Sequence, residues 1–136
     1  MTQPDAHTLY VFDATALIDL ERRDSLSILT GLGDRVCIPT PVKTEVSRPR
    51  THLETWLRRN PMAIKRFVPG SPEEELYYHL TLTSGPALGA GEAAAIAIAS
   101  HRGGMLVTDD QAAQRIAAEL SVACIGIATF LAMPIL

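Results

Sequence analysis

Short apolar segments alternate along the chain with longer segments of helical periodicity. Four apolar runs rich in β-branched and aromatic residues are predicted as strands, over residues 9–12, 36–38, 105–108 and 122–125. Residues 64–68 are predicted as a short edge strand. The periodic apolar positions between these runs predict helices over residues 14–22, 25–32, 41–48, 51–59, 72–83, 92–101, 110–120 and 128–133.

Helical segments separate the predicted strands, so consecutive strands are joined by crossover connections. Such connections produce parallel strands whose sheet is covered by helices on both faces. We therefore expect an α/β fold, in the form of an α/β/α sandwich around a central, mostly parallel sheet. Ligands of such sheets bind at the carboxyl ends of the strands, near the point where the strand order reverses.

Proline and glycine mark the expected ends of several elements. Pro39 ends a strand and Pro41 begins the next helix, which Pro49 closes. The glycine pair at 103–104 ends the alanine-rich helix, and residues 84–91 before that helix are expected to form a loop.

Composition favours one domain over residues 1–136. The 136 residues are 47% apolar and 20% charged, with a net charge of -3, and a chain of this size can bury a core without disulfides or structural metal.

Cys37 and Cys124 each lie in an apolar run and are expected to be buried thiols, while the histidines show no ligand spacing and are expected at the surface. We find no signal sequence or membrane-spanning run, so we expect a soluble, cytoplasmic protein without membrane contact.

Positive charge is concentrated in residues 41–66, which are expected to form a helical basic arm. The cations there outnumber the acids and are Lys43, Arg48, Arg50, Arg58, Arg59, Lys65 and Arg66. Such a segment is either a solvated helical face or a contact surface for a polyanion. In the second case, the candidate nucleic-acid-binding residues are Arg48, Arg50, Arg58 and Arg59. Trp56 is either a stacking group or, as we prefer, a half-buried aromatic.

Acidic residues follow two of the predicted strands at the same rim of the sheet. Asp13 follows the first strand, and Asp109 and Asp110 follow a later one. Glu92 begins the alanine-rich helix, and Glu45 lies on a helix entered directly from a strand end. Taken singly, each acid is explained as a helix cap, a first-turn residue or a surface residue. Together they repel one another unless a hard cation neutralises them, and oxygen ligands select Mg²⁺ or Mn²⁺.

The pattern of these residues resembles the PIN-domain nucleases, and among them the short toxin-like members of the VapC type. The segments that carry the resemblance are 11–18 (VFDATALI), 41–46 (PVKTEV), 89–99 (GAGEAAAIAIA) and 106–110 (LVTDD). The resemblance implies a PIN-like fold and four catalytic acids, which are Asp13, Glu45, Glu92 and Asp110. It also implies a metal site formed by Asp13, Glu92 and Asp110, with Thr15 and Asp109 as supporting residues.

The same resemblance implies an endoribonuclease that uses Mg²⁺ or Mn²⁺ to hydrolyse RNA, with water as the nucleophile. It further implies a cognate antitoxin protein as partner, and the apolar, alanine-rich helices suggest a homodimer. Many members carry a further aspartate shortly after Asp110, where this chain has residues 111–113 (QAA). The alternative is therefore a catalytically weak PIN-like module that binds RNA or assembles with partners. A phosphotransferase with Asp13 as nucleophile is disfavoured, because Thr15 occupies the place of the second aspartate such enzymes need.

Overall fold

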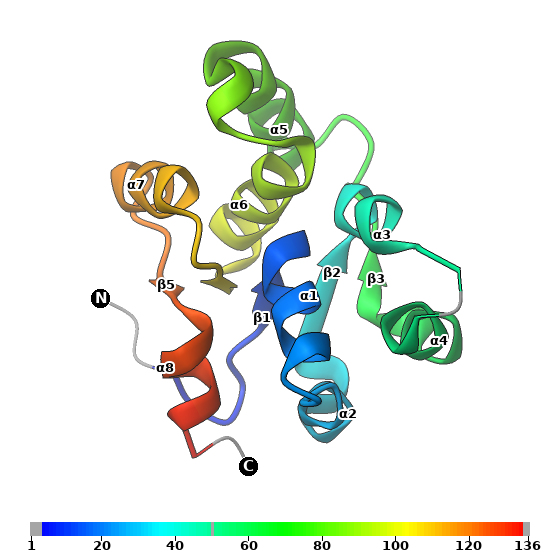
Figure 1. The fold of residues 1–136 in the computed structure, drawn as a ribbon. Coiled ribbons are helices and arrows are strands. Elements are labelled where there is room, and N and C mark those ends of the chain that lie inside the picture. Colours follow the sequence, from blue (N-terminus) through cyan, green and yellow to red (C-terminus); the bar gives the residue numbers. More distant parts are fainter. Residues whose placement is uncertain (1–3, 50, 135–136) are drawn as a thin grey trace.

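The computed structural model describes residues 4–49 and 51–134, and its centre is a five-stranded sheet (Figure 1). The strand order is β3-β2-β1-β4-β5. The strands are β1 (Tyr10–Phe12), β2 (Val36–Pro39), β3 (Ile64–Lys65), β4 (Met105–Val107) and β5 (Cys124–Ile125). Every neighbouring pair is parallel, which confirms the expected α/β class.

Helices fill the connections between the strands. They are α1 (Ala14–Arg22), α2 (Ser27–Leu32), α3 (Thr40–Val46), α4 (His52–Arg59), α5 (Pro72–Thr83), α6 (Ala90–Arg102), α7 (Gln111–Glu119) and α8 (Ile127–Ala132). Short 3-10 turns lie at Gly33–Arg35, Pro61–Ala63 and Gly85–Ala87. Among these described helices, none has the length and apolar character needed to cross a bilayer.

Alternation along each strand divides the apolar residues between the two faces of the sheet. Tyr10 and Phe12 of β1 pack in one layer with residues of α1, α2, α3, α4 and α8. Val11, between them, packs in the opposite layer with residues of α5, α6 and α7. Cys37 of β2 and Leu106 of β4 share the layer of Val11. This arrangement of helices, sheet and helices confirms the expected sandwich.

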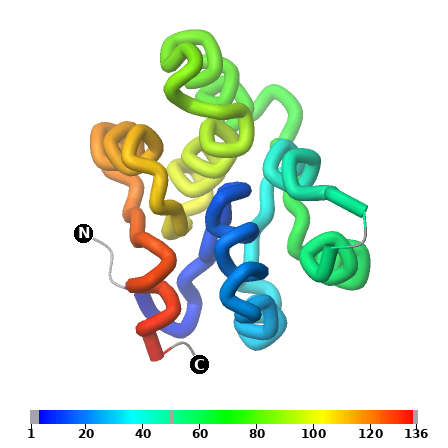
Figure 2. Tube along the Cα trace, in the orientation of Figure 1, coloured from blue at the N-terminus to red at the C-terminus, as the bar shows by residue number. Residues whose placement is uncertain are grey.

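The chain begins in the middle of the sheet, so that its blue first strand lies between later segments on both sides (Figure 2). It moves outward through β2 to β3, then continues on the other side of β1 with β4 and β5. The strand order therefore reverses between β1 and β4, whose last residues, Phe12 and Val107, are partners in register. Such a reversal leaves a crevice for ligands at the carboxyl ends of the strands. Asp13 and Thr108 are the first residues beyond these two ends.

Some element boundaries differ from the sequence-based expectation. α6 begins at Ala90 rather than at Glu92, because the Glu92 side chain accepts a hydrogen bond from the Gly89 N–H and so closes the first turn. β3 ends at Lys65 rather than at residue 68, because the Val68 N–H donates to a side chain instead of to a strand. The ends of α2, α3, α4, α7 and α8 shift by one or two residues.

Two glycines carry the chain from α6 into β4. Gly103 has a φ of +67°, in the left-handed region that ends helices. A Cβ on Gly104 would lie 2.9 Å from Val11 Cγ2 and 3.2 Å from the Leu9 carbonyl oxygen. Glycine at this position therefore lets the chain pass close to β1 and enter the strand next to it.

Candidate functional site

Asp13 lies at the carboxyl end of β1 and caps α1. Its side chain is fully buried, and Oδ1 accepts hydrogen bonds from the Ala16 N–H at 2.8 Å and from the Thr15 hydroxyl at 3.1 Å. The Thr108 hydroxyl donates to Oδ2. The capping explanation offered for a single aspartate is thus correct, and Thr15 supports Asp13 directly. The contact from Thr108 goes beyond capping, because it comes from the neighbouring strand.

Thr108 connects two of the predicted acids, although sequence analysis did not select it. This fully buried residue follows β4, donates its hydroxyl hydrogen to Asp13 and accepts the Asp110 N–H at 3.1 Å. The Gln114 side-chain amide donates to the Thr108 carbonyl oxygen at 3.0 Å, which holds α7 against the end of β4. A hydroxyl residue at a strand end, directly before two aspartates, is the sequence signal that would have identified it.

The adjacent aspartates after β4 point to different helices. Asp110 caps α7, with Oδ2 accepting the Ala113 N–H at 2.8 Å. Asp109 is exposed, and its Oδ1 accepts the Ile127 N–H at the start of α8 at 3.2 Å. Asp110 therefore belongs to the group of acids around the reversal point, whereas the carboxylate of Asp109 holds α8.

Two glutamates meet at the N-terminus of α6. Glu92 Oε1 accepts the Gly89 N–H at 2.8 Å, and Glu45 Oε1 accepts the Gly91 N–H at 2.7 Å. A Cβ on Gly91 would lie 2.5 Å from Glu45 Oε1, so glycine at this position makes room for the glutamate from α3. Both carboxylates also complement the positive end of the α6 dipole. The start of α6 therefore binds one carboxylate from α6 itself and one from α3.

Burial and mutual repulsion raise the pKa values of two of these acids. For Asp13, burial raises the pKa above its ordinary value, hydrogen bonds led by that of Thr108 lower it, and the charge of Asp110 raises it. For Glu92, burial is the main cause that raises the pKa to about 7. The Gly89 N–H lowers it, whereas Asp110 and then Asp13 raise it further. Near neutral pH, Glu92 is therefore partly protonated.

The structure brings Asp13, Glu92 and Asp110 within electrostatic reach of one another and places Glu45 beside Glu92. The donor set fits a hard divalent cation, because it consists of carboxylate oxygens and carries negative charge that such an ion would offset. Across residues 4–49 and 51–134, no three His, Cys, Asp or Glu side chains are close enough to hold a metal as they stand. Binding therefore requires side-chain movement at this rim.

The predicted basic arm packs against the body of the protein. Leu53 and Leu57 of α4 are buried in the core, and the Leu53 N–H donates to Glu21 of α1 at 2.7 Å. Trp56 packs partly buried against the same core, with its indole N–H donating to the Thr30 hydroxyl at 3.0 Å. This confirms the preferred interpretation of Trp56 as a half-buried aromatic.

The cations of this segment lie on its outer surface. Arg48, Arg58 and Arg59 are exposed, and Arg58 forms an ion pair with Glu54 of 3.4 Å. Arg50 lies outside the described residues. Figure 1 shows α4, which carries Arg58 and Arg59, on the opposite side of α1 from α6 and α7.

The cysteines and histidines take no part in the site. Cys37 is buried and Cys124 is half-buried, and burial raises the pKa of these free thiols to about 12 and about 11 respectively. Both are therefore protonated and poorly reactive at neutral pH. All the histidines are exposed, as expected; they are His7, His52, His79 and His101.

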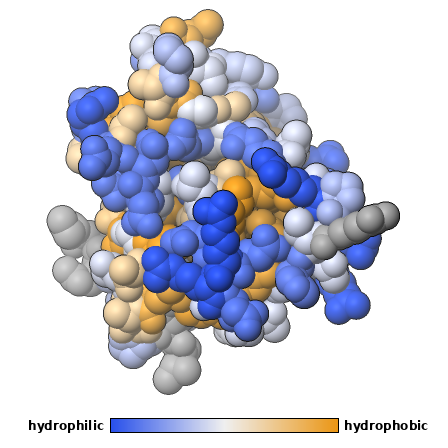
Figure 3. Space-filling view, viewed as in Figure 1, coloured by the Kyte–Doolittle hydropathy of each residue, from blue (hydrophilic) through white to orange (hydrophobic). Residues whose placement is uncertain are grey.

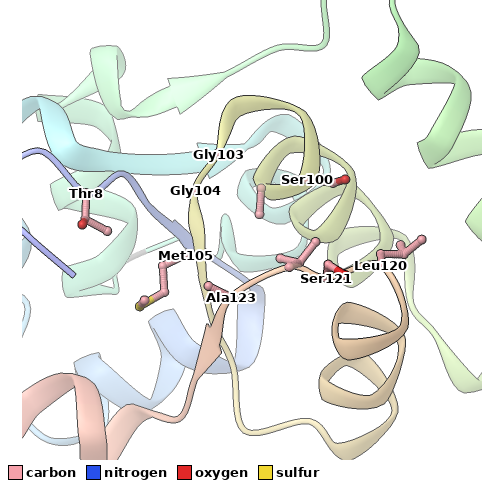
Figure 4. Close-up of a pocket in the computed structure, with 10 residues that line it drawn as sticks. Thr8, Ser100, Gly103, Gly104, Met105, Leu120, Ser121 and Ala123 are labelled. Carbon is pink, nitrogen blue, oxygen red and sulfur yellow. The ribbon is translucent and has the colours of Figure 1, made fainter. Parts of the chain in front are cut away.

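A pocket of about 110 Å³ lies away from the acids, at the opposite edge of the sheet (Figure 4). It forms where α6 turns into β4 and where α7 leads into β5, and its lining includes Gly103, Ser121 and Ala123. Its described lining contains no acidic residue. The candidate site is therefore defined by its side chains and not by the shape of a cavity.

We expect Thr108→Val to lower the free energy of unfolding by about 1–3 kcal/mol, because it leaves a buried Asp13 oxygen without its donor. Thr108→Ser keeps the hydroxyl, so its free energy of unfolding should fall by less. Urea unfolding of the three proteins measures the difference. A loss of stability for serine with none for valine would show that the methyl group, and not the hydrogen bond, stabilises this position.

Comparisons with known proteins bear on the family and the fold of the chain. The family model DUF3368, described as a PIN domain, matches residues 9–133. Among solved structures, the chain is similar to PAE2754 from Pyrobaculum aerophilum, with a TM-score of 0.56 and 18% identity over 91% of this chain and 94% of that chain. At this identity the likeness concerns the fold alone. No curated protein matches the sequence.

Proposed function

Because the chain belongs to the PIN-domain family, we propose that it is a Mg²⁺- or Mn²⁺-dependent endoribonuclease. PIN domains are generally nucleases, and hence hydrolases that act on nucleic acid. The observation that carries the proposal is the meeting of Asp13, Glu92 and Asp110 at the strand-order reversal, where the pKa of Glu92 is raised to about 7. Burial and then the charges of Asp110 and Asp13 raise this pKa, and a divalent cation bound here would offset those charges.

In this proposal each acid has a distinct role. Asp13, Glu92 and Asp110 would hold the metal ion, which would supply a lowered pKa for a bound water and positive charge to offset that of the phosphate. Thr15 and Thr108 orient Asp13 through their hydroxyl hydrogen bonds. Thr108 also accepts the Asp110 N–H, so movements of these two acids are linked.

Glu45 would act beside the metal ligands. Its Oε1 is held by the Gly91 N–H, while its exposed position leaves the carboxylate accessible to substrate and water. A carboxylate here can accept a proton from an attacking water during hydrolysis. Asp109 would support the site indirectly, by holding α8 at the end of β5.

We further propose that residues 1–136 form one PIN-like domain that acts in the cytoplasm as the toxin of a toxin-antitoxin pair, and that the protein forms a homodimer. The motifs of the VapC type support the toxin role. The alternative, a catalytically weak module that binds RNA or assembles with partners, is favoured by one observation. Asp13, Glu92 and Asp110 all accept N–H groups at helix starts, a role that requires no chemistry.

Incubation of the purified protein with labelled single-stranded RNA tests the proposal. We expect cleavage with Mg²⁺ or Mn²⁺, none in EDTA, and little cleavage of a DNA of the same sequence. RNA that binds but stays intact in both metals would favour the weak module. Cleavage that persists in EDTA would contradict the metal-dependent mechanism.

The exposed arginines of the basic arm are proposed to contact the RNA backbone. Replacing Arg48, Arg58 and Arg59 by glutamine should weaken RNA binding and reduce the slope of log K against log salt by about 2, since each lost phosphate contact removes roughly 0.7. Filter binding across a salt series measures both quantities. An unchanged slope would show that the arm is only a solvated helical face.

A further inference from the structure

Three aromatic side chains form a cluster outside the centre of the core. The Phe67 and Tyr77 rings lie 4.8 Å apart at an angle of 35°, and the Tyr77 and Tyr78 rings lie 5.3 Å apart at 56°. Tyr10 and Phe12, by contrast, pack with Phe130 inside the core. The cluster therefore joins α5 to the segment that follows β3, and it continues outward to the surface.

Packing explains the inner part of the cluster but not its outer part. Phe67 and Tyr77 are partly buried against the layer formed by α5, α6 and α7. Tyr78 is 56% exposed, and Leu82, one turn further along α5, is 84% exposed. Figure 3 shows apolar surface at the top of the molecule, over α5, above a more hydrophilic middle. Tyr78 thus presents an aromatic ring to solvent with a second ring behind it.

A partly buried ion pair connects the elements of this region. Arg102 Nε donates to Glu73 Oε1 at 3.0 Å and Arg102 Nη2 donates to Oε2 at 2.8 Å, while the same Nη2 also reaches the Arg66 carbonyl oxygen at 2.8 Å. The Val68 N–H donates to Glu73 Oε2 at 3.2 Å. The start of α5, the end of α6 and the chain around Phe67 are therefore fixed to one another. A rigid aromatic surface loses little conformational entropy when it binds a ligand.

The cluster also adjoins the candidate site. Burial, Tyr78 and Glu45, in that order, raise the pKa of Tyr77, so the Glu45 carboxylate is within electrostatic reach of the Tyr77 hydroxyl. Glu45 is bonded to Gly91, which precedes Glu92 in α6. The helix that carries Tyr77 and Tyr78, α5, also packs on α6, which carries Glu92, so the cluster lies on a helix next to that of the acids.

A cation directly precedes the cluster along the chain. Arg66 precedes Phe67, and its side chain is exposed, while its carbonyl oxygen is held by Arg102. Single-stranded nucleic acid binds where bases stack on aromatic rings and cations contact the backbone. The exposed Tyr78 ring lies at one end of the stacked cluster and the exposed Arg66 adjoins Phe67 at the other end, which matches that chemistry.

We propose that Tyr78, supported by Tyr77 and Phe67, stacks with an unpaired base of single-stranded RNA, and that Arg66 contacts a phosphate next to that base. This proposal rests on the proposed function and specifies its substrate: the RNA must be unpaired on the α5 side of the acids. Stacking selects single strands because the faces of paired bases in a duplex are covered by their neighbours.

Fluorescence anisotropy of a labelled single-stranded RNA tests this stacking platform, meaning Tyr78 with Tyr77 and Phe67 behind it. The measurement is made in EDTA so that the RNA stays intact. Tyr78→Ala should weaken binding about 5- to 150-fold, the scale of one lost stacking contact, without changing the salt slope. Tyr78→Phe keeps the ring and should bind like the unaltered protein. Arg66→Gln should instead reduce the salt slope by roughly 0.7. Leu82→Ala removes a comparable exposed apolar group from α5 and is the matched control.

Several results would overturn the platform. Tyr78→Ala that binds within twofold of the unaltered protein, or Leu82→Ala that loses as much affinity as Tyr78→Ala, excludes stacking at Tyr78. Sedimentation that shows Tyr78→Ala dissociating a dimer, with RNA affinity unchanged, would assign the surface to a second copy of the chain. If the unaltered protein cleaves RNA while any of these results holds, only the platform is wrong. If it neither binds nor cleaves RNA, the proposed function fails as well.

Discussion

Glu92→Gln and Asp110→Asn are each expected to reduce cleavage of single-stranded RNA by about 100-fold or more, the scale on which single groups contribute in preorganised sites. Each change keeps the side-chain volume and removes one of the charges that meet at the reversal point. Each amide oxygen can still accept the N–H that the carboxylate accepts now, from Gly89 or from Ala113. A loss of cleavage with an unchanged thermal melt therefore reports on chemistry and not on folding.

Glu45→Gln extends this experiment to the acid from α3. The amide oxygen can still accept the Gly91 N–H, so the packing of α3 on α6 should be retained. We expect cleavage to fall on the same scale, because only the charge is removed. Glu119→Gln, an exposed change at the end of α7, is the matched control. Turnover in Glu45→Gln that equals that of the control would mark Glu45 as a structural partner of α6 alone.

Addition of Mg²⁺ or Mn²⁺ is expected to stabilise the folded protein, and more strongly at pH 8 than at pH 6. An ion at 100 times its Kd raises the free energy of unfolding by about 2.7 kcal/mol, and hence the Tm by roughly 10 °C for a domain of this size. Carboxylate ligands must be deprotonated to bind it. Since the pKa of Glu92 is about 7, the ion competes with a proton at pH 6 and hardly at all at pH 8.

The protein without metal should show the opposite dependence on pH. Folding raises the pKa of Glu92 from 4.5 to about 7, so the folded state binds this proton more tightly than the unfolded state does. The resulting stability is present below pH 4.5 and is lost as the pH rises through about 7. Near pH 7 the Glu73 carboxylate, whose pKa is lowered by Arg102 from 4.5, is ionised in both states and adds no slope there.

Glu92→Gln separates these effects. This variant should be more stable than the unaltered protein at pH 8 without metal, since the repelling charge is gone, and should show no metal-induced rise in Tm. Thermal melts at both pH values, with and without the ion, measure all of these quantities. A full rise in Tm for Glu92→Gln would place the metal elsewhere, and Asp13→Asn would then identify whether Asp13 belongs to that other site.

The class of fold and the rim that carries the acids follow from local patterns. Alternation around Val11 and helical spacing in α1 depend only on neighbouring residues, and they predict a strand that ends at Asp13. The carboxyl ends of parallel strands lie at one edge whatever their separation along the chain. Asp13 and Asp110 were therefore expected at the same rim, although the hydrogen bond between Asp13 and Thr108 joins residues 95 positions apart.

The partners of individual side chains follow from strand order and helix packing, which local patterns do not contain. Thr108 reaches Asp13 only because β4 lies directly beside β1. Asp109 and Asp110 are equivalent by position in the sequence, yet one turns to α8 and the other to α7.

Glu45 and Glu92 show the same division between local and tertiary causes. Their residue types and helical settings were apparent from the chain, and the motif around Gly91 was apparent with them. The packing of α3 on α6 brings Glu45 to Gly91, which has no side chain in its way. Burial at the sheet edge is the main cause that raises the pKa of Glu92 to about 7. Sequence periodicity places a residue on an element, but burial and the charges that surround it arise only when distant elements pack together.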